Sequence, residues 1–520
     1  MMMAVNRGGT PAPSASSGAG ARPALAAPSL RAVVWLALGV RVALFPFAEN
    51  KHGDAPMRAL IVERMNADPV AAWDPRSFCQ FGPLPIEVMR PFVAADTDAR
   101  RSSRVPSLIA GLAALVPFLA LGRRMIGAMG PSSGPALALA ALALALSPLH
   151  VQVSTTAASE SIYLLLLLAA LERLHAAVSG ARRRDFVVAG ALMSLAAVTR
   201  YDTWVAVPAA AAALLAFGPR RRRDGVNAVS FFVAAAVLPA AYLVWTWIVS
   251  GDPFFFGRYI TRDHATLARA AVERLGGGVA RLRQVGIWAV SFAAAMTPVG
   301  LLAAGIAVRG WRAWPPATRV VVVAAVAPIG AYLAKGLLLG DFEPLPRFAI
   351  APGAVLLPLA ASSLVAMAAR RRWHRLVPAL LIGAGAAAIA AVALVLAFAG
   401  PGRVWGGAES IGPLTRLDGE DRELAAYLLR NRRPDEGVLI DTGGYADIVV
   451  AHAARVPAPR SVTLAQTRDP IKTVAESRRV TAASWFAIHD DSWGRTAVPD
   501  WPADSVRFGH WRLAHVGHAP

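Results

Sequence analysis

The residues best suited to chemistry lie in the run HGDAPMR, residues 52–58, directly after the first long apolar stretch, residues 30–48. A polar segment begins here and extends to about residue 103, after which the chain is largely apolar to residue 399. A carboxylate held where a membrane helix meets water can contact both a lipid-borne and a water-side substrate. Asp54 is therefore our first candidate for a general base. The alternative is structural, because Asp54 precedes Ala55 and Pro56 and this order is typical of a helix N-cap.

Glu160 is the second candidate carboxylate. It lies at the start of an apolar stretch, residues 156–177. Ionisable residues inside membrane spans are costly and usually face a polar cavity. The alternative is a side chain at headgroup level that is exposed to water.

Basic residues near the ends of other apolar stretches could bind a phosphate. Arginine suits this role because its planar fork donates two hydrogen bonds to phosphate oxygens. The candidates are Arg200, Arg258, Arg347 and Lys335. Arg200 could instead pair locally with Asp202, and Arg258 could belong to a basic, aromatic segment that touches headgroups.

Other common reactive sites are missing from the sequence. No His, Cys or carboxylate set has the spacing of a metal site, and no nucleophile elbow or phosphate-binding loop occurs. The turn at Gly443-Gly444 lacks the spacing of a nucleotide-binding loop. The single cysteine, Cys79, cannot form an internal disulfide.

The elements that position these residues are membrane helices. The chain is 56% hydrophobic and only 17% charged, where a soluble domain carries about a quarter charged residues. Its apolar residues occur in blocks that approach the roughly 20 residues needed to span a bilayer. We therefore predict about eleven spans, near residues 30–48, 104–121, 134–150, 156–177, 186–199, 203–218, 228–250, 285–308, 317–339, 346–369 and 375–399.

The net charge is +20, and the placement of the basic residues indicates how the chain is oriented in the membrane. Arginines cluster in short loops between the spans, and such loops remain on the cytoplasmic side. The charge therefore indicates membrane topology rather than nucleic-acid binding. The N-terminus is predicted inside, in a disordered leader, residues 1–29. The first outer loop, residues 49–103, a second loop, residues 251–284, and the C-terminal region are predicted outside.

The outer segments have structure of their own. Met57, Leu60, Ile61 and Met65 follow a helical spacing with Arg58 on the other side, which predicts an amphipathic helix at the membrane surface. Residues 83–93 read as a second interfacial piece broken by prolines. Residues 401–520 predict a small α/β domain, with helices at 420–430 and 446–453 and strands at 437–441, 483–488 and 511–516.

This layout resembles the C-type glycosyltransferase superfamily, the GT-C fold, and within it the bacterial relatives of protein O-mannosyltransferases and of the lipid A aminoarabinose transferase. The resemblance covers residues 30–400, and the outer domain fits the soluble domain that such enzymes often carry. One difference is that many members have Asp followed by Glu in the first loop, where this chain has Asp54 followed by Ala55. The local matches are Asp54, the segment 99–107 (ARRSSRVPS), Ser147-Pro148 leading to Glu160, and Arg347 followed by Pro352.

The resemblance implies an enzyme of the bacterial inner membrane that moves a sugar from a polyprenyl-phosphate donor to an acceptor hydroxyl on the outer face. Asp54 would be the base in an inverting single displacement, with Glu160 the second catalytic candidate. Arg347, Arg200, Arg258 and Lys335 would bind the donor phosphate. The scheme needs no cofactor besides the lipid-linked donor and no metal, and the acceptor could be a protein, a lipid or a glycan.

Two alternatives remain at this point. A transporter or lipid-carrier flippase with an accessory outer domain would have a similar composition, although such proteins tend to contain internal repeats, and none is evident. A non-catalytic envelope assembly protein of the same fold is the other alternative, because the second acid of the first loop is missing.

Overall fold

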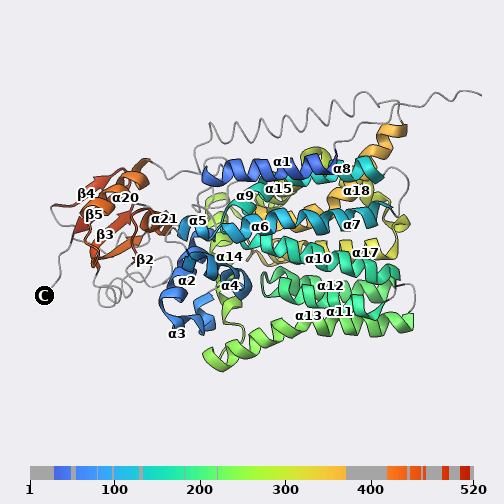
Figure 1. Ribbon diagram of the computed structural model, residues 1–520, viewed down its shortest axis with the longest axis horizontal. Helices are drawn as coiled ribbons and strands as arrows, with labels where there is room; N and C mark the ends of the chain where they lie inside the picture. The colour runs from blue at the N-terminus through green and yellow to red at the C-terminus, as the bar shows by residue number, and fades with distance from the viewer. Residues whose placement is uncertain are drawn as a thin grey trace, which may run out of the picture.

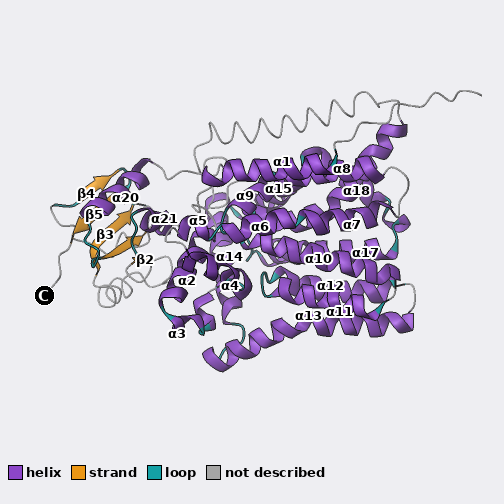
Figure 2. Cartoon of the chain, in the orientation of Figure 1, coloured by secondary structure: helices purple, strands orange, loops and turns teal. Residues whose placement is uncertain are grey.

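The structure, a computed structural model, is a bundle of long helices with a small sheet-containing domain at one end (Figure 1). Figure 2 shows that the described strands lie only in this small domain. The predicted leader up to residue 28, the span at 375–399 and the turn at Gly443-Gly444 lie outside the described residues. These are residues 29–47, 54–78, 80–95, 99–127, 133–180, 182–218, 221–370, 419–441, 446–457, 461–463, 483–490 and 504–515.

The helices of the bundle coincide with the apolar blocks of the sequence. Each span predicted up to residue 369 overlaps a helix or a bent pair of helices. The helices are α1 (Leu30–Leu44), α6 (Val105–Ala113), α7 (Leu115–Gly127), α8 (Ser133–Leu146), α9 (Pro148–Thr155), α10 (Ser159–Gly180), α11 (Arg183–Ala197), α12 (Asp202–Phe217), α13 (Arg221–Ser250), α15 (Gly277–Met296), α16 (Pro298–Arg309), α17 (Pro316–Ala334) and α18 (Ile350–Arg370).

Within the described residues, five helices are long and apolar enough to cross a membrane, and up to seven if each of two bent pairs counts as one span. The remaining predicted spans there correspond to shorter helices such as α12. The five are Val105–Gly127, Ser159–Gly180, Gly225–Ser250, Pro316–Leu339 and Pro346–Met367, and the bent pairs join α8 to α9 and α15 to α16.

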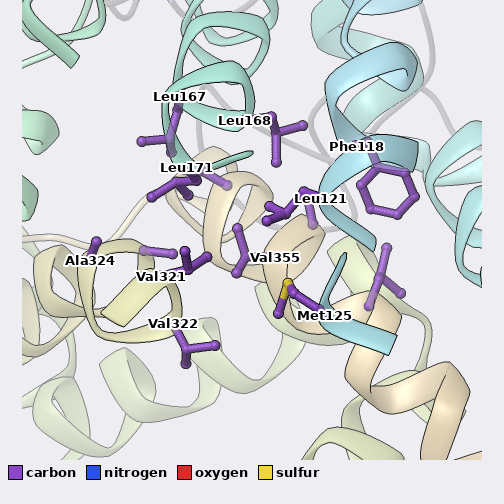
Figure 3. Close-up of a cluster of buried hydrophobic side chains, with 14 of the residues drawn as sticks. Phe118, Leu121, Met125, Leu167, Leu168, Leu171, Val321, Val322, Ala324 and Val355 are labelled. Atoms are coloured by element: carbon purple, nitrogen blue, oxygen red, sulfur yellow. The ribbon is translucent and has the colours of Figure 1, made fainter. Parts of the chain in front are cut away.

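The core of the bundle is built from small and branched apolar side chains contributed by several helices. Figure 3 shows Phe118, Leu121 and Met125 of α7 close to Leu168 of α10 and Val355 of α18. The many alanines in this core, such as those of α8, let neighbouring helix backbones approach closely, which is typical of helix packing in membranes. The helices of the bundle are therefore closely packed around one apolar core.

A buried arginine supports the bend between α8 and α9. The two helices meet at 53°, because Pro148 cannot donate a backbone hydrogen bond to α8. Arg41 of α1, fully buried, donates to the oxygen of Ala145 at 2.9 Å and to Ser154 Oγ at 2.9 Å. Its Nη2 also lies 2.8 Å from His150 Nδ1. The sequence pattern gave no indication of this network.

The span predicted at 285–308 is interrupted. Helix α15 ends at Met296, and α16 continues at an angle of 100°. Thr297 between them has a φ of 68°, and the following Pro298 favours a break at this position. The predicted span is therefore divided into two helices that meet at a sharp bend.

The segment predicted as the first outer loop, residues 49–103, folds in its described part into short helices that pack on the end of the bundle. They are α2 (Ala55–Ala67), α3 (Pro69–Ala72), η2 (Pro75–Phe78), α4 (Pro83–Ala95) and α5 (Ala99–Ser102). Two expectations need correction. Helix α2 is buried on nearly all sides, including Arg58, and α4 is one helix that contains Pro91 rather than a broken segment.

The C-terminal domain is a five-stranded mixed sheet in the order β2-β1-β3-β5-β4. β1 runs parallel to β2 and β3, while β5 runs antiparallel to β3 and β4. The predicted helices and strands are present, and β2 and β4 are additional. The elements are α20 (Gly419–Asn431), β1 (Gly437–Asp441), α21 (Ala446–Ala453), β2 (Ser461–Thr463), β3 (Ala483–His489), β4 (Val506–Phe508) and β5 (Trp511–His515).

Helix α21 of this domain packs against the first outer loop, and Figure 1 shows it between the sheet and α2. Ile448 is fully buried in a cluster with Met57, Leu60 and other apolar side chains of that loop. His452 Nε2 lies 3.0 Å from Glu63 Oε2. The C-terminal domain therefore contacts the helix that begins directly after Asp54.

Candidate active site

Asp54 occupies the N-cap position of α2, but its side chain does not cap the helix. Its φ of −79° and ψ of −3° are close to helical values, whereas a capping residue usually has an extended backbone. The carboxylate instead forms ion pairs, at 2.7 Å to Arg347 Nη2 and at 3.4 Å to Arg58 Nη2. The capping interpretation of this side chain is therefore wrong.

Glu160 lies in the first turn of α10, where the helix dipole favours a negative charge. It is 2% exposed, so it is not a headgroup-level residue in contact with water. Its Oε1 pairs with Arg200 Nη1 and lies 3.3 Å from Arg347 Nε. Its Oε2 has no hydrogen-bond partner among the described residues. An acceptor atom is therefore available for a ligand.

Arg200 connects Glu160 to a third carboxylate. Its Nε donates to Asp202 Oδ2 at 2.7 Å, as the local-pair interpretation predicted, while its Nη1 reaches Glu160. Asp202, in the first turn of α12, also accepts a hydrogen bond from the Tyr332 hydroxyl at its Oδ1. Both carboxylate oxygens of Asp202 are therefore occupied within the protein.

Arg58 is the residue that the sequence interpretation placed on the wrong side of α2. It is 2% exposed, its guanidinium carbon lies 4.6 Å from the centre of the Phe81 ring, and Nη1 donates to the oxygen of Ala157 at 3.3 Å. Burial lowers the pKa of Arg58, and the charges of Glu160 and Asp54 oppose this shift. An arginine four residues after Asp54 faces the same side of a helix, and this spacing was the signal that could have revealed the pair.

Several of these side chains line one cavity. Asp54 is not part of the lining and joins the group through Arg347. The lining combines charged side chains with aromatic rings, and it includes Glu160, Tyr163, Arg200, Asp202, Tyr332, Arg347 and Phe348.

Stacked rings support this aromatic wall. Tyr332 lies 4.6 Å from Phe342 and 5.1 Å from Phe348, measured between ring centres. His264 of α14 (Phe255–Leu275) stacks on Phe342, with 4.3 Å between the ring centres. Burial lowers the pKa of His264 to about 4, so this ring is neutral at physiological pH. Neither Tyr332 nor Phe342 was selected from the sequence, because stacking depends on tertiary contacts.

Two predicted phosphate-binding residues lie elsewhere. Arg258 is three-quarters exposed and pairs with Asp252, which agrees with the interpretation as a surface segment. Lys335 lies 3.9 Å from Asp341 and is not among the residues that line the cavity. The structure therefore brings together Asp54, Glu160, Arg200 and Arg347 but not Arg258 or Lys335.

The described residues contain no group of three or more His, Cys, Asp or Glu side chains arranged to hold a metal ion. The cavity lining supplies carboxylates and guanidiniums. Such a site can accept a proton and can stabilise an anion.

Residues 91–247 match the model of the dolichyl-phosphate-mannose-protein mannosyltransferase family. ArnT from Cupriavidus metallidurans bound to undecaprenyl phosphate is similar in structure, with a TM-score of 0.58 and 15% identity over 93% of this chain and 97% of that chain. The chain has the GT-C fold. This confirms both the predicted resemblance and the class of helical membrane protein with several spans.

A second structure has the same GT-C fold with a longer chain. The oligosaccharyltransferase AglB from Archaeoglobus fulgidus, in complex with an inhibitory peptide and a dolichol-phosphate, gives a TM-score of 0.51 at 12% identity over 88% of this chain and 69% of that chain. No curated protein sequence matches this chain. The family match includes Glu160 and Arg200 but not Asp54 or Arg347, which the structure adds to them.

Proposed function

We propose that the protein is a glycosyltransferase that moves a sugar from a polyprenyl-phosphate donor to an acceptor hydroxyl on the outer face of the membrane. The observation that carries this proposal is the contact of Asp54 with Arg347 at 2.7 Å, beside Glu160. A proton acceptor and an anion-binding group thus lie within one ion-paired cluster. The lipid phosphates bound to ArnT and AglB, which share the fold, support a lipid-linked donor.

In the proposed reaction, the acceptor oxygen forms a bond to the anomeric carbon of the sugar. The bond from that carbon to the phosphate oxygen breaks, and its electron pair leaves with the polyprenyl phosphate. Asp54 takes the acceptor proton, and general-base help of this kind contributes typically 10²–10⁴-fold. Arg347 stabilises the charge that develops on the leaving phosphate, and Glu160 holds Arg347 and Arg200 in place.

A single displacement of this kind inverts the anomeric centre. It requires no cofactor or metal in addition to the lipid-linked donor. The partners are then a polyprenyl-phosphate sugar, membrane lipids and an acceptor that is a protein, a lipid or a glycan. The arginine-rich loops support a location in the bacterial inner membrane, with the N-terminus in the cytoplasm and the C-terminal domain outside.

Donor binding tests this proposal. In purified full-length protein, Arg347→Ala should weaken binding of a polyprenyl-phosphate sugar more than binding of the acceptor. If the donor affinity is unchanged, Arg347 does not bind the phosphate and Arg200 becomes the candidate. Mass spectrometry of envelope glycans and glycolipids, with and without the gene, should then identify the sugar and the acceptor, and a complete lack of change would contradict the proposal.

A further inference from the structure

The ion-paired cluster is balanced in charge. Its described members comprise as many carboxylates as guanidiniums, and each carboxylate is bound to at least one arginine. The members are Asp54, Glu160, Asp202, Arg58, Arg200 and Arg347. A phosphate that enters this cluster must therefore compete with a carboxylate for a guanidinium.

Arg347 is the guanidinium with the best access. Its side chain is 15% exposed, against 11% for Arg200 and 3% for Arg58. Arg200 already uses Nε for Asp202 and Nη1 for Glu160. Arg347 Nη2 lies 2.7 Å from Asp54 Oδ2, and its Nε lies 3.3 Å from Glu160 Oε1 without a hydrogen bond. Both nitrogens are donors that a phosphate oxygen could use.

Both carboxylates that Arg347 would give up have another partner in place. Asp54 keeps Arg58 at 3.4 Å, and Glu160 keeps Arg200. An exchange of Asp54 for phosphate on Arg347 therefore leaves no buried charge unpaired, which would otherwise be strongly unfavourable. Exchange of Asp202 for phosphate on Arg200 would leave Asp202 without an ion-pair partner, because no second described cation lies within ion-pair distance of it.

We infer that Arg347 is an exchange site, at which the phosphate of a polyprenyl-phosphate lipid displaces Asp54. This inference rests on the proposed function and adds how the base is controlled. Before the donor binds, the contact with Arg347 occupies the carboxylate oxygen Oδ2 of Asp54. After exchange, Oδ2 keeps only the longer contact of 3.4 Å with Arg58 Nη2, and it accepts a proton more readily than in the presence of both arginines. Binding of the lipid phosphate thus removes the shorter of the two ion pairs that hold the base.

Competition gives an unusual prediction, namely that removal of the proposed base strengthens lipid binding. Undecaprenyl phosphate, without a sugar, is titrated into the purified full chain in nanodiscs. Asp54→Asn should bind it about tenfold more tightly than the wild type, since hydrogen bonds to charged groups contribute about 1.5–3 kcal/mol. Asp54→Ala provides a second variant, and thermal unfolding shows whether each one is folded.

Asp202→Asn is the matched control. It removes one negative charge from the same cluster, but Asp202 pairs with Arg200 and not with Arg347. Its affinity gain should be clearly smaller than that of Asp54→Asn. In an Arg347→Gln background, Asp54→Asn should give no gain.

The outcomes separate the two proposals. If the wild type binds undecaprenyl phosphate but Asp54→Asn binds it equally or more weakly, the exchange is wrong while the proposed function stands. Equal gains for Asp54→Asn and Asp202→Asn would also overturn the exchange, because they would reflect net charge alone. If the wild type fails to bind the lipid, both the exchange and the lipid-linked donor are wrong.

Discussion

Ile448 should couple the C-terminal domain to the helix that follows Asp54. Its side chain is fully buried among residues of the first outer loop, whereas its neighbour Val449 is buried in the core of the C-terminal domain itself. Truncation of a buried isoleucine to alanine costs about 2–5 kcal/mol. For Ile448→Ala we take about 3 kcal/mol, which corresponds to about a 100-fold increase in local opening.

Hydrogen–deuterium exchange of the full-length protein measures this effect. Ile448→Ala should accelerate exchange in α2 while the strands β1 and β3 remain protected. Val449→Ala, the control on the same helix, should accelerate exchange in those strands instead. Unchanged exchange in α2 of Ile448→Ala, or the same exchange pattern in both variants, would show that Ile448 does not couple the two parts.

Three further predictions concern the surroundings of the site. Gly82→Ala should destabilise the protein by about 2 kcal/mol, as seen in thermal unfolding, because its Cβ would overlap the Val198 oxygen and lie 2.6 Å from the Thr199 oxygen. Tyr332→Phe should lower the unfolding temperature by removing a hydrogen bond to a carboxylate, worth about 1.5 kcal/mol, with no fall if that bond is not formed. The pKa of His264 is about 4, below its usual 6.5. Because the unfolded chain then binds a proton more readily than the folded protein, the free energy of unfolding should fall by up to about 3 kcal/mol as the pH drops from about 6.5 to 4. His264→Gln should flatten this pH dependence.

The membrane class and most of the helices follow from the sequence because each depends on local composition. Apolar blocks near 20 residues long and arginine-rich short loops are properties of the chain itself. The break at Thr297 was missed because the apolar pattern continues through it. The bend at Pro148 could be expected from its proline, but its stabilisation by Arg41 depends on a contact with α1.

The candidate site could be predicted in part, because some of its residues are marked by their local sequence. Asp54, Glu160, Arg200 and Arg347 stand out as charged residues at the ends of apolar segments, and the structure brings them together. Tyr332 became visible only through its contact with Asp202, 130 residues away. Arg258 and Lys335 have the same sequence features as Arg347, but they project into other surroundings.

Sugar transfer by the reconstituted full-length protein tests directly whether Asp54 is the base of a glycosyltransferase. A panel of polyprenyl-phosphate sugars is supplied with an envelope extract as the source of acceptors, and the wild type is compared with Asp54→Asn. The wild type should transfer at least one sugar, and Asp54→Asn should lose this transfer while it unfolds at the same temperature. Full transfer by Asp54→Asn would contradict the assignment of the base, and no transfer by the wild type from any donor would contradict the function itself.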